Sequence, residues 1–303
     1  MAIDLGPRLV IGISSRALFD LELENRIFEL DGVEAYRDFQ REHEHVVLGP
    51  GAAFPIVRAL LKLNRLSANE QPLVEVVVMS RNSPDLGLRV LHSATEHGLD
   101  ITRAAFSSGR SLSPYLSAFS VDLFLSRSAS DVQEAVDAGI AAAEIYDPPE
   151  GYQADEEEIR IAFDADAVIF SDESEQIYKT KGLDAFLEHE KTNAKKPLAA
   201  GPFAKLLKAL AALQQAKAPL RIAIVTARNS PAHERVIRTL RLWGVSVNEA
   251  FFLGGVPKDQ VLSAFRAHIF FDDQHNHIYT ASKYVPAARV PYIGGDLLKK
   301  KPG

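Results

Sequence analysis

The sequence predicts an α/β protein made of two tandem doubly wound units, each a parallel sheet covered by helices on both faces. Short apolar runs rich in β-branched residues alternate with longer segments of helical periodicity. These runs are too continuous for strands with one face in water, so we expect them to be buried on both faces. The chain of 303 residues also matches itself, because residues 11–28 align without a gap on residues 161–178.

The apolar runs predict three strands in each half of the chain. They are residues 9–13, 74–79 and 121–125 in the first half, and 159–163, 221–226 and 268–271 in the second. Helices are expected at residues 201–215, 232–243 and 258–267, of which the first places four leucines on one face. Ligands of such sheets bind outside the carboxyl ends of the strands. The polar residues that follow the strands are therefore the first candidates for a site.

Three further segments of the first half recur in the second in the same order. Residues 76–84 match 223–231, residues 98–109 match 244–255, and residues 117–127 match 263–273. Four acidic residues of the second half have no acidic counterpart in the first. They are Asp164, Asp166, Asp272 and Asp273, which align with Ser14, Arg16, Ser126 and Arg127. Only the second half is therefore expected to bind a cation.

The length and the repeat predict two domains, residues 1–147 and 148–303, each large enough to bury a core. Residues 146–158 carry two prolines, a glycine and an acidic run, which is typical of an exposed connector. The net charge of −6, with both signs interspersed, gives no reason to expect binding of nucleic acid or of a membrane surface. The chain has no cysteine, no apolar leader and no run long enough for a membrane span, so a cytoplasmic protein is expected.

Carboxylates and a hydroxyl end two strands of the second half. Asp164 and Asp166 follow the strand at 159–163, and their spacing sends both side chains to the same side of an extended chain. They could converge on one ion, or they could merely cap a turn. Thr226, Ala227 and Arg228 form the turn after the next strand, which could hold phosphate or be an ordinary helix start.

A lysine and an acidic pair complete the candidate set. Lys258 opens a helix, where a solvated lysine is the alternative interpretation. Asp272 and Asp273 end a third strand. Two carboxylates about 4 Å apart repel by roughly 4 kcal/mol at an effective dielectric near 20, and a divalent cation would reverse that repulsion.

Taken in order, an apolar strand with DxD, a strand ending in threonine, a lysine and a strand ending in DD resemble the haloacid dehalogenase-like (HAD-like) phosphohydrolases. The resemblance becomes closer with five segments. They are FDADAVIFSDESE, FLEHE, PLAAGPF, VTARNSP and FFDDQ, which together are similar to the cytosolic 5'-nucleotidase I family. The SSRALFD segment of the first half fits the same family, so the resemblance covers nearly the whole chain.

The resemblance implies a HAD-like, Rossmannoid fold for both units, the first one degenerate. It also implies roles for the residues that match the motifs. Asp164 would be the nucleophile, and Asp166 the general acid that later acts as a base. Thr226 and Lys258 would hold the phosphoryl oxygens, and Mg²⁺ would bind Asp164, the main-chain carbonyl of Asp166 and Asp273, which we favour over Asp272.

The substrate is expected to meet a small cap formed by residues 172–220. Asp172, Phe186, His189 and Lys195 are its candidate substrate contacts. His189 has a structural alternative, because a similar EHE segment recurs in the first half, where catalysis is impossible. Lys195, with its neighbour Lys196, could simply be solvated.

These expectations combine into a Mg²⁺-dependent 5'-nucleotidase that hydrolyses nucleoside 5'-monophosphates, AMP-like or deoxyribonucleotides. The alternatives are a phosphatase for another small phosphomonoester, and a nucleotide-binding regulatory protein. The first half is expected to be architectural, or else to bind a regulatory nucleotide where Arg16 and Arg127 replace the acids. The sequence is compatible with an oligomer.

Overall fold

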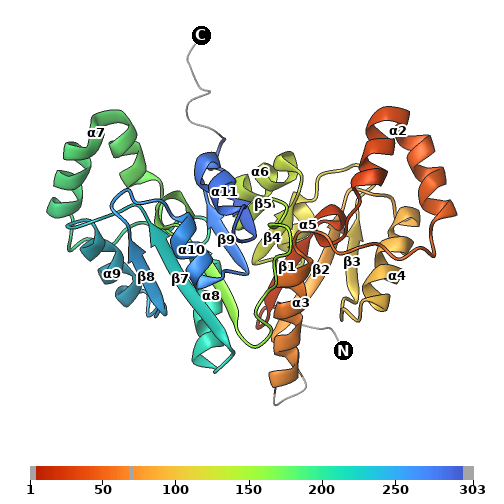
Figure 1. The fold of residues 1–303 in the computed structure, drawn as a ribbon, viewed down its shortest axis with the longest axis horizontal. Helices are drawn as coiled ribbons and strands as arrows, with labels where there is room; N and C mark the ends of the chain where they lie inside the picture. The colour runs from red at the N-terminus through yellow and green to blue at the C-terminus, as the bar shows by residue number, and fades with distance from the viewer. Residues whose placement is uncertain (1–4, 68–70, 296–303) are drawn as a thin grey trace, which may run out of the picture. The chain divides into compact units, whose positions relative to one another are not determined.

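The computed structural model describes residues 5–67 and 71–295. The chain divides into two compact units, Met1–Ile145 and Tyr146–Gly303, a division two residues before the predicted boundary. Each unit has parallel strands connected by helices, as Figure 1 shows, so the predicted α/β class is confirmed. No described helix combines the length and the apolar character that a membrane crossing needs.

The first unit has five described strands. Its elements are β1 (Leu9–Ile13), α1 (Ser15–Leu18), α2 (Glu22–Glu42), α3 (Phe54–Lys62), η1 (Leu63–Leu66), β2 (Val74–Ser80), η2 (Asp85–Gly87), α4 (Leu88–Glu96), β3 (Arg103–Phe106), α5 (Ser113–Ala118), β4 (Leu123–Ser126), α6 (Ala129–Asp137) and β5 (Ala142–Ile145). The strand order is β3-β2-β1-β4-β5. The first strand is thus central, and its parallel neighbours are β2 and β4.

The second unit follows the same plan. Its elements are β6 (Ile159–Phe163), η3 (Ala165–Ile169), α7 (Glu173–Thr192), α8 (Ala204–Gln215), β7 (Leu220–Thr226), α9 (His233–Leu242), β8 (Glu249–Phe252), α10 (Asp259–Phe265), β9 (Ile269–Asp272), α11 (His275–Ala281) and β10 (Ala287–Arg289). The strand order is β8-β7-β6-β9-β10, in which each strand occupies the place of its counterpart in the first unit. The three predicted helices are confirmed with ends shorter by up to three residues.

Alternating side chains place a core on each face of each sheet. In the first unit, Val77 and Met79 of β2 pack with Leu116 of α5 and Val132 of α6. The intervening valines of β2 point to the other face, where α3 packs. In the second unit, α10 and α11 cover one face. On the other face the ring of Phe203, next to α8, lies 4.9 Å from that of Phe271 in β9.

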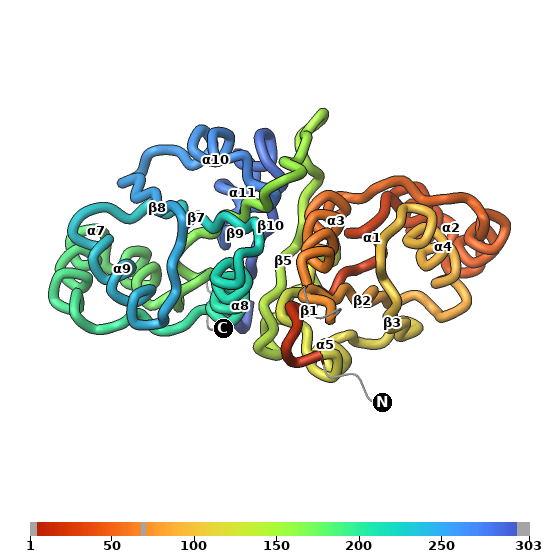
Figure 2. The backbone as a smooth tube through the Cα atoms, turned by 90° about the horizontal axis from the view of Figure 1, so that it is seen from below, coloured from red at the N-terminus to blue at the C-terminus, as the bar shows by residue number. Residues whose placement is uncertain are grey.

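Each unit also carries a long helix kinked at a glycine. Gly32 in α2 and Gly182 in α7 have φ values of +85° and +83°, which glycine adopts without strain. In each unit this helix lies beside the helix that follows the second strand, α4 or α9 (Figures 1 and 2). Within the range predicted as a cap, residues 172–220, the structure has α7, the loop after it, and α8, which packs on β7. The first unit has a counterpart of α7 in α2.

The turn after the first strand differs between the units by one residue. In the first unit it is a regular helical turn, α1, capped by the Ser14 hydroxyl. In the second it is a π-turn, η3, in which Asp166 is extended and Ala167 has a φ of +58°. The amide of Phe203 donates to the carbonyl of Val168, whereas in the first unit the amide of Ala53 donates to the carbonyl of Ala17. Ala17 thus corresponds to Val168 and not to Ala167, so the gapless match of the sequences ends inside this turn. Single π-turns of this kind are frequent at functional sites.

Candidate functional site

The predicted acids and the threonine meet at the carboxyl edge of the second sheet. Asp164 follows β6, Thr226 ends β7, and Asp272 ends β9, with β6 between the other two strands. The amide of Asp164 donates to the carbonyl of Phe271 at 2.8 Å, which fixes the two acidic loops against each other. The topology therefore converges residues that lie more than 100 positions apart in the chain.

Lys258 joins two of the carboxylates. Its Nζ lies 2.8 Å from Asp164 Oδ1 and 2.6 Å from Asp272 Oδ2, and its side chain is 4% exposed. Burial alone would lower the pKa of Lys258, but the two carboxylates raise it above its usual value, so the ammonium stays charged. Burial raises the pKa of Asp164 although Lys258 opposes the shift. The solvated lysine considered as an alternative is ruled out by this burial.

Three carboxylates form a buried cluster that could hold a metal ion. Asp164, Asp272 and Asp273 each offer one oxygen, and these oxygens lie within 4.8 Å of one another. Burial raises the pKa of Asp273 well above its usual range, and repulsion by Asp272, Glu175 and Asp164 adds to the shift. A divalent cation would offset this repulsion, and carboxylate oxygens are the ligands that Mg²⁺ prefers.

The two members of the acidic pair differ in their partners. Asp272 accepts from Lys258, from the amide of Gln274 at 2.8 Å and from His277 Nδ1 at 3.1 Å. Asp273 accepts from the hydroxyl of Tyr292 through Oδ2, while its buried Oδ1 has no hydrogen-bond partner among the described residues. Within the acidic pair, the buried oxygen without a hydrogen-bond partner among the described residues thus belongs to Asp273.

Arg228 is engaged by carboxylates. Its Nε and Nη2 donate to the two oxygens of Asp166 at 2.7 and 2.6 Å, and its Nη1 donates to Glu190 at 2.5 Å. Glu190 is fully buried and also accepts from Arg235 at 2.9 Å and from the hydroxyl of Ser174 at 2.8 Å. The guanidinium group predicted to bind phosphate holds Asp166 in this structure, and its binding of phosphate stays a prediction.

The rest of the predicted phosphate turn lies at the sheet edge. Thr226 is buried, and its hydroxyl accepts from the amide of Arg228 at 3.3 Å. Ala227 between them is exposed. The hydroxyl therefore orders the turn.

The four candidate substrate contacts differ in their partners. Phe186 is buried with its ring 5.4 Å from the guanidinium of Arg228, and His189 Nε2 lies 3.2 Å from Arg235 Nη1. Asp172 accepts from Gln176 at the start of α7. Lys195 is exposed in the loop after α7. It takes no part in the ion pairs of Arg228 with Asp166 and of Lys258 with Asp164. The contacts of His189 agree with its structural alternative.

Sequence reasoning missed four residues that complete the site. They are Glu175, Glu190, His277 and Tyr292. Glu190 lies in the EHE segment, but the signal was ambiguous because the repeat made that segment look structural. The chain after β10 brings Tyr292 to Asp273, and no local motif marks that contact.

Comparisons with known proteins agree with this geometry. A family model described as 5'-nucleotidase matches residues 1–296. The human protein named cytosolic 5'-nucleotidase 1B is 39% identical over 288 residues, which are 91% of this chain and 47% of that protein. The chain thus spans about half the length of this curated relative. Among solved structures, a putative universal stress protein from Pseudomonas aeruginosa UCBPP-PA14 covers 95% of both chains at 10% identity, with a TM-score of 0.36 that is too low to carry an argument.

Proposed function

Because the chain belongs to the 5'-nucleotidase family, we propose that it hydrolyses nucleoside 5'-monophosphates to nucleoside and inorganic phosphate, with Mg²⁺ as cofactor. AMP-like nucleotides and deoxyribonucleotides are the substrates we expect. The observation that carries the proposal is the buried Lys258 between Asp164 and Asp272, next to the unpartnered oxygen of Asp273. The cytoplasm as its location stays a prediction, supported by the name of the human relative.

The chemistry is assigned to the second unit, residues 146–303, as a catalytic HAD-like domain. The acids at the strand ends occur there and are replaced in the first unit, which we propose to be a degenerate copy. Asp164 and Asp273 fit Mg²⁺, and the main-chain carbonyl of Asp166 is a third proposed ligand. Bound there, the ion would neutralise charge on the phosphoryl group and on the cluster.

In the first step, an Asp164 carboxylate oxygen attacks phosphorus and the bond from phosphorus to the ester oxygen breaks. Lys258 and the turn at Thr226 stabilise the phosphoryl oxygens, since phosphoryl transfer depends mostly on positioning and charge. For this step Asp166 carries a proton, so one of its oxygens is released from Arg228, and it gives that proton to the departing nucleoside oxygen. The product of this step is an aspartyl phosphate at residue 164.

In the second step, water attacks phosphorus while Asp166 takes a proton from it, and the bond to the Asp164 oxygen breaks. This step releases phosphate and restores the Asp164 carboxylate. Arg228 is a positioning residue here, because it holds both oxygens of Asp166 and is itself held by Glu190.

The test is phosphate release from nucleoside 5'-monophosphates, 3'-monophosphates and sugar phosphates, with Mg²⁺ or with EDTA. We expect hydrolysis only of 5'-monophosphates and only with Mg²⁺. Asp164→Asn should abolish it, whereas Asp184→Asn, an exposed change in α7, should not. Preference for sugar phosphates, or turnover by Asp164→Asn, would overturn the proposal.

A further inference from the structure

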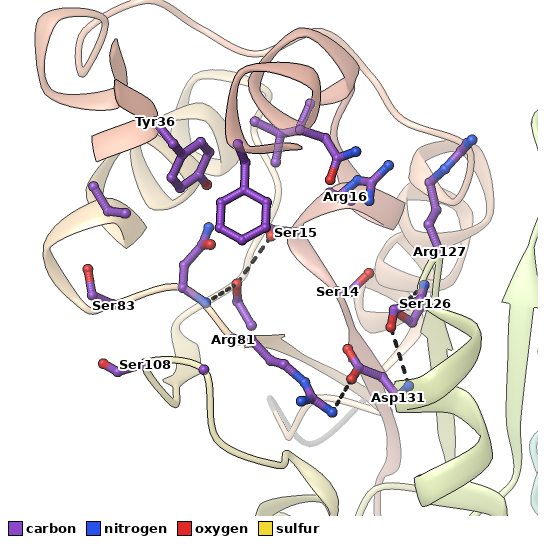
Figure 3. A pocket seen from close by; sticks show the side chains of 18 of the residues that line it. Ser14, Ser15, Arg16, Tyr36, Arg81, Ser83, Ser108, Ser126, Arg127 and Asp131 are labelled. Carbon is purple, nitrogen blue, oxygen red and sulfur yellow. Dashed lines mark hydrogen bonds and ion pairs between the residues drawn. The ribbon is translucent and has the colours of Figure 1, made fainter. Parts of the chain in front are cut away.

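The first unit contains a cavity of about 590 Å³ at the carboxyl edge of its own sheet. Its wall is formed by the loops after β1, β2 and β4 and by the kinked helix α2 (Figure 3). The volume lies within the range of small-molecule sites. This cavity lies at the edge of the first sheet that corresponds to the acidic cluster of the second. Ser14, Ser126 and Arg127, which align with Asp164, Asp272 and Asp273, line it, and so does Asp131, which pairs with Arg81.

Serines stand at the ends of the three central strands. Ser14 follows β1, Ser80 ends β2 and Ser126 ends β4, and all three line the cavity. The gapless sequence match pairs Thr226 with Met79, but the strand register corrects this. Ser80 pairs with Phe106 as Thr226 pairs with Phe252.

The hydroxyl of the phosphate turn is therefore retained in the first unit. Ser80 accepts from the amide of Asn82 at 3.2 Å, as Thr226 does from that of Arg228. The residue that precedes α5, where Lys258 precedes α10, is the buried Leu112. The cavity thus retains a turn suited to phosphate but has neither the nucleophile nor the lysine.

Two arginines replace acids at this edge. Arg16 and Arg127 both reach Glu22, at 3.1 and 3.4 Å, and the side chain of Glu22 is 47% exposed. The Nε of Arg16 is buried and has no hydrogen-bond partner among the described residues. Ion pairs to an exposed carboxylate are weak, so an anion of higher charge can displace it. Arg81 differs, because Asp131 and Glu134 both pair with it.

The opposite wall is aromatic. Phe28 and Tyr36 on α2 pack edge to face with ring centroids 5.8 Å apart, and both line the cavity. Phe28 is 45% exposed, so part of its surface is open to a ligand. The second unit retains this pair with the order reversed, as Tyr178 and Phe186 at 6.3 Å. Flat apolar surface of this kind suits a nucleobase.

We propose that this cavity is a non-catalytic binding site for a phosphorylated nucleoside. The phosphate lies between Arg16 and Arg127 at the serine-lined strand ends, and the base packs against Phe28 and Tyr36. The cavity size, the retained turn and the lost acids carry the inference together. It does not depend on the activity proposed for the second unit.

The test is calorimetric titration of the full chain with ADP. The chain carries Asp164→Asn, because this substitution prevents turnover in the second unit. One site per chain is expected in the first unit, whether or not ADP also binds the second. Adding Arg16→Ala and Arg127→Ala should weaken this site at least about tenfold and leave any site in the second unit unchanged. Arg41→Ala is the matched control, because Arg41 pairs with one exposed carboxylate outside the cavity.

Separate titrations with inorganic phosphate and with ADP show which wall of the cavity binds the phosphate and which binds the base. Removal of the two arginines should abolish binding of inorganic phosphate at this site, whereas Phe28→Ala should weaken ADP and spare phosphate. A crystal of the Asp164→Asn chain soaked with ADP locates the ligand even if the arginine variants fail to fold. A single site insensitive to the arginine changes, or ADP density only in the second unit, would overturn the proposal. Because hydrolysis is measured on the unaltered chain, either proposal can fail without the other.

Discussion

Substitution of Glu190 by glutamine would change one fully buried charge at nearly constant volume. The Glu190 carboxylate accepts from Arg228 through one oxygen, and from Arg235 and Ser174 through the other. Glutamine can keep two of these bonds through its carbonyl oxygen. Its NH₂ group would then face the N–H groups of the Arg228 guanidinium, and two donors cannot form a hydrogen bond.

The expected loss of stability follows from these contacts. One hydrogen bond between charged groups, worth about 1.5–3 kcal/mol, is lost, and the other two weaken because the acceptor becomes neutral. Burial adds to the cost, since breaking a buried ion pair costs about 3–5 kcal/mol. We therefore expect a loss of about 3 kcal/mol in the free energy of unfolding of residues 146–303. For a domain of this size, that corresponds to a melting temperature lower by about 6–12 °C.

The assay is urea and thermal unfolding of wild type, Glu190→Gln and Glu234→Gln. Glu234 forms an exposed pair with Arg238 on α9, so its change should cost less than about 1 kcal/mol. Turnover should fall in Glu190→Gln at temperatures where the variant is folded, because Arg228, no longer held by Glu190, positions Asp166 less well. Equal stability of Glu190→Gln and wild type would refute the structural role assigned to Glu190.

Three further predictions concern the metal, the pH and the backbone. Mg²⁺ should raise the melting temperature of the wild type but not of Asp273→Asn, because the ion offsets carboxylate repulsion only in the folded state. Burial lowers the pKa of His268, whose Nδ1 accepts from the amide of Arg160, so its contribution to stability is complete above about pH 6.5 and is lost as the pH falls toward the folded-state value. In Gly201→Ala, the new Cβ would meet the carbonyl oxygen of Phe170 at 2.3 Å, and unfolding should become easier by about 2–3 kcal/mol.

Each of these predictions has its control. Asp184→Asn should keep the stabilisation by Mg²⁺, and equal stabilisation of Asp273→Asn would argue against that ligand. In His268→Gln, the fall in stability between about pH 7.5 and 5.5 should be smaller than in wild type, and an unchanged slope would exclude His268 as its source. Gly49→Ala, where the nearest atom is 4.0 Å away, should be tolerated, and equal losses at both glycines would contradict the steric argument.

The strands β1, β2, β4, β6, β7 and β9 could be read from the sequence because they are apolar and buried on both faces. The strands β3, β5, β8 and β10 are not predicted from it. β3 and β8 lie at the ends of their strand orders and are only partly buried, so they carry little apolar signal. Packing rather than local pattern forms them.

The residues of the candidate site could be predicted where they lie at the ends of predicted strands. The structure brings together Asp164, Thr226, Lys258 and the acidic pair, as their order along the chain indicated. The role of Arg228 was not predictable, because its partner Glu190 comes from α7 and only the fold joins them. The one-residue shift that places Ser80 opposite Thr226 was also hidden, because the RNSP segments match better out of structural register.

The most direct test of the central claim is to trap the covalent intermediate on the second unit. Wild type and Asp164→Asn would be mixed with nucleoside 5'-monophosphate labelled in the phosphate and with Mg²⁺, and quenched with acid within one turnover. One portion would be counted for protein-bound label, and a second portion would be reduced with borohydride, which expels the phosphate, and mapped by peptide mass spectrometry. The proposed mechanism predicts label on the wild type alone and conversion of residue 164 to homoserine. Label on another residue, or turnover with no trapped species and an unmodified Asp164, would contradict it.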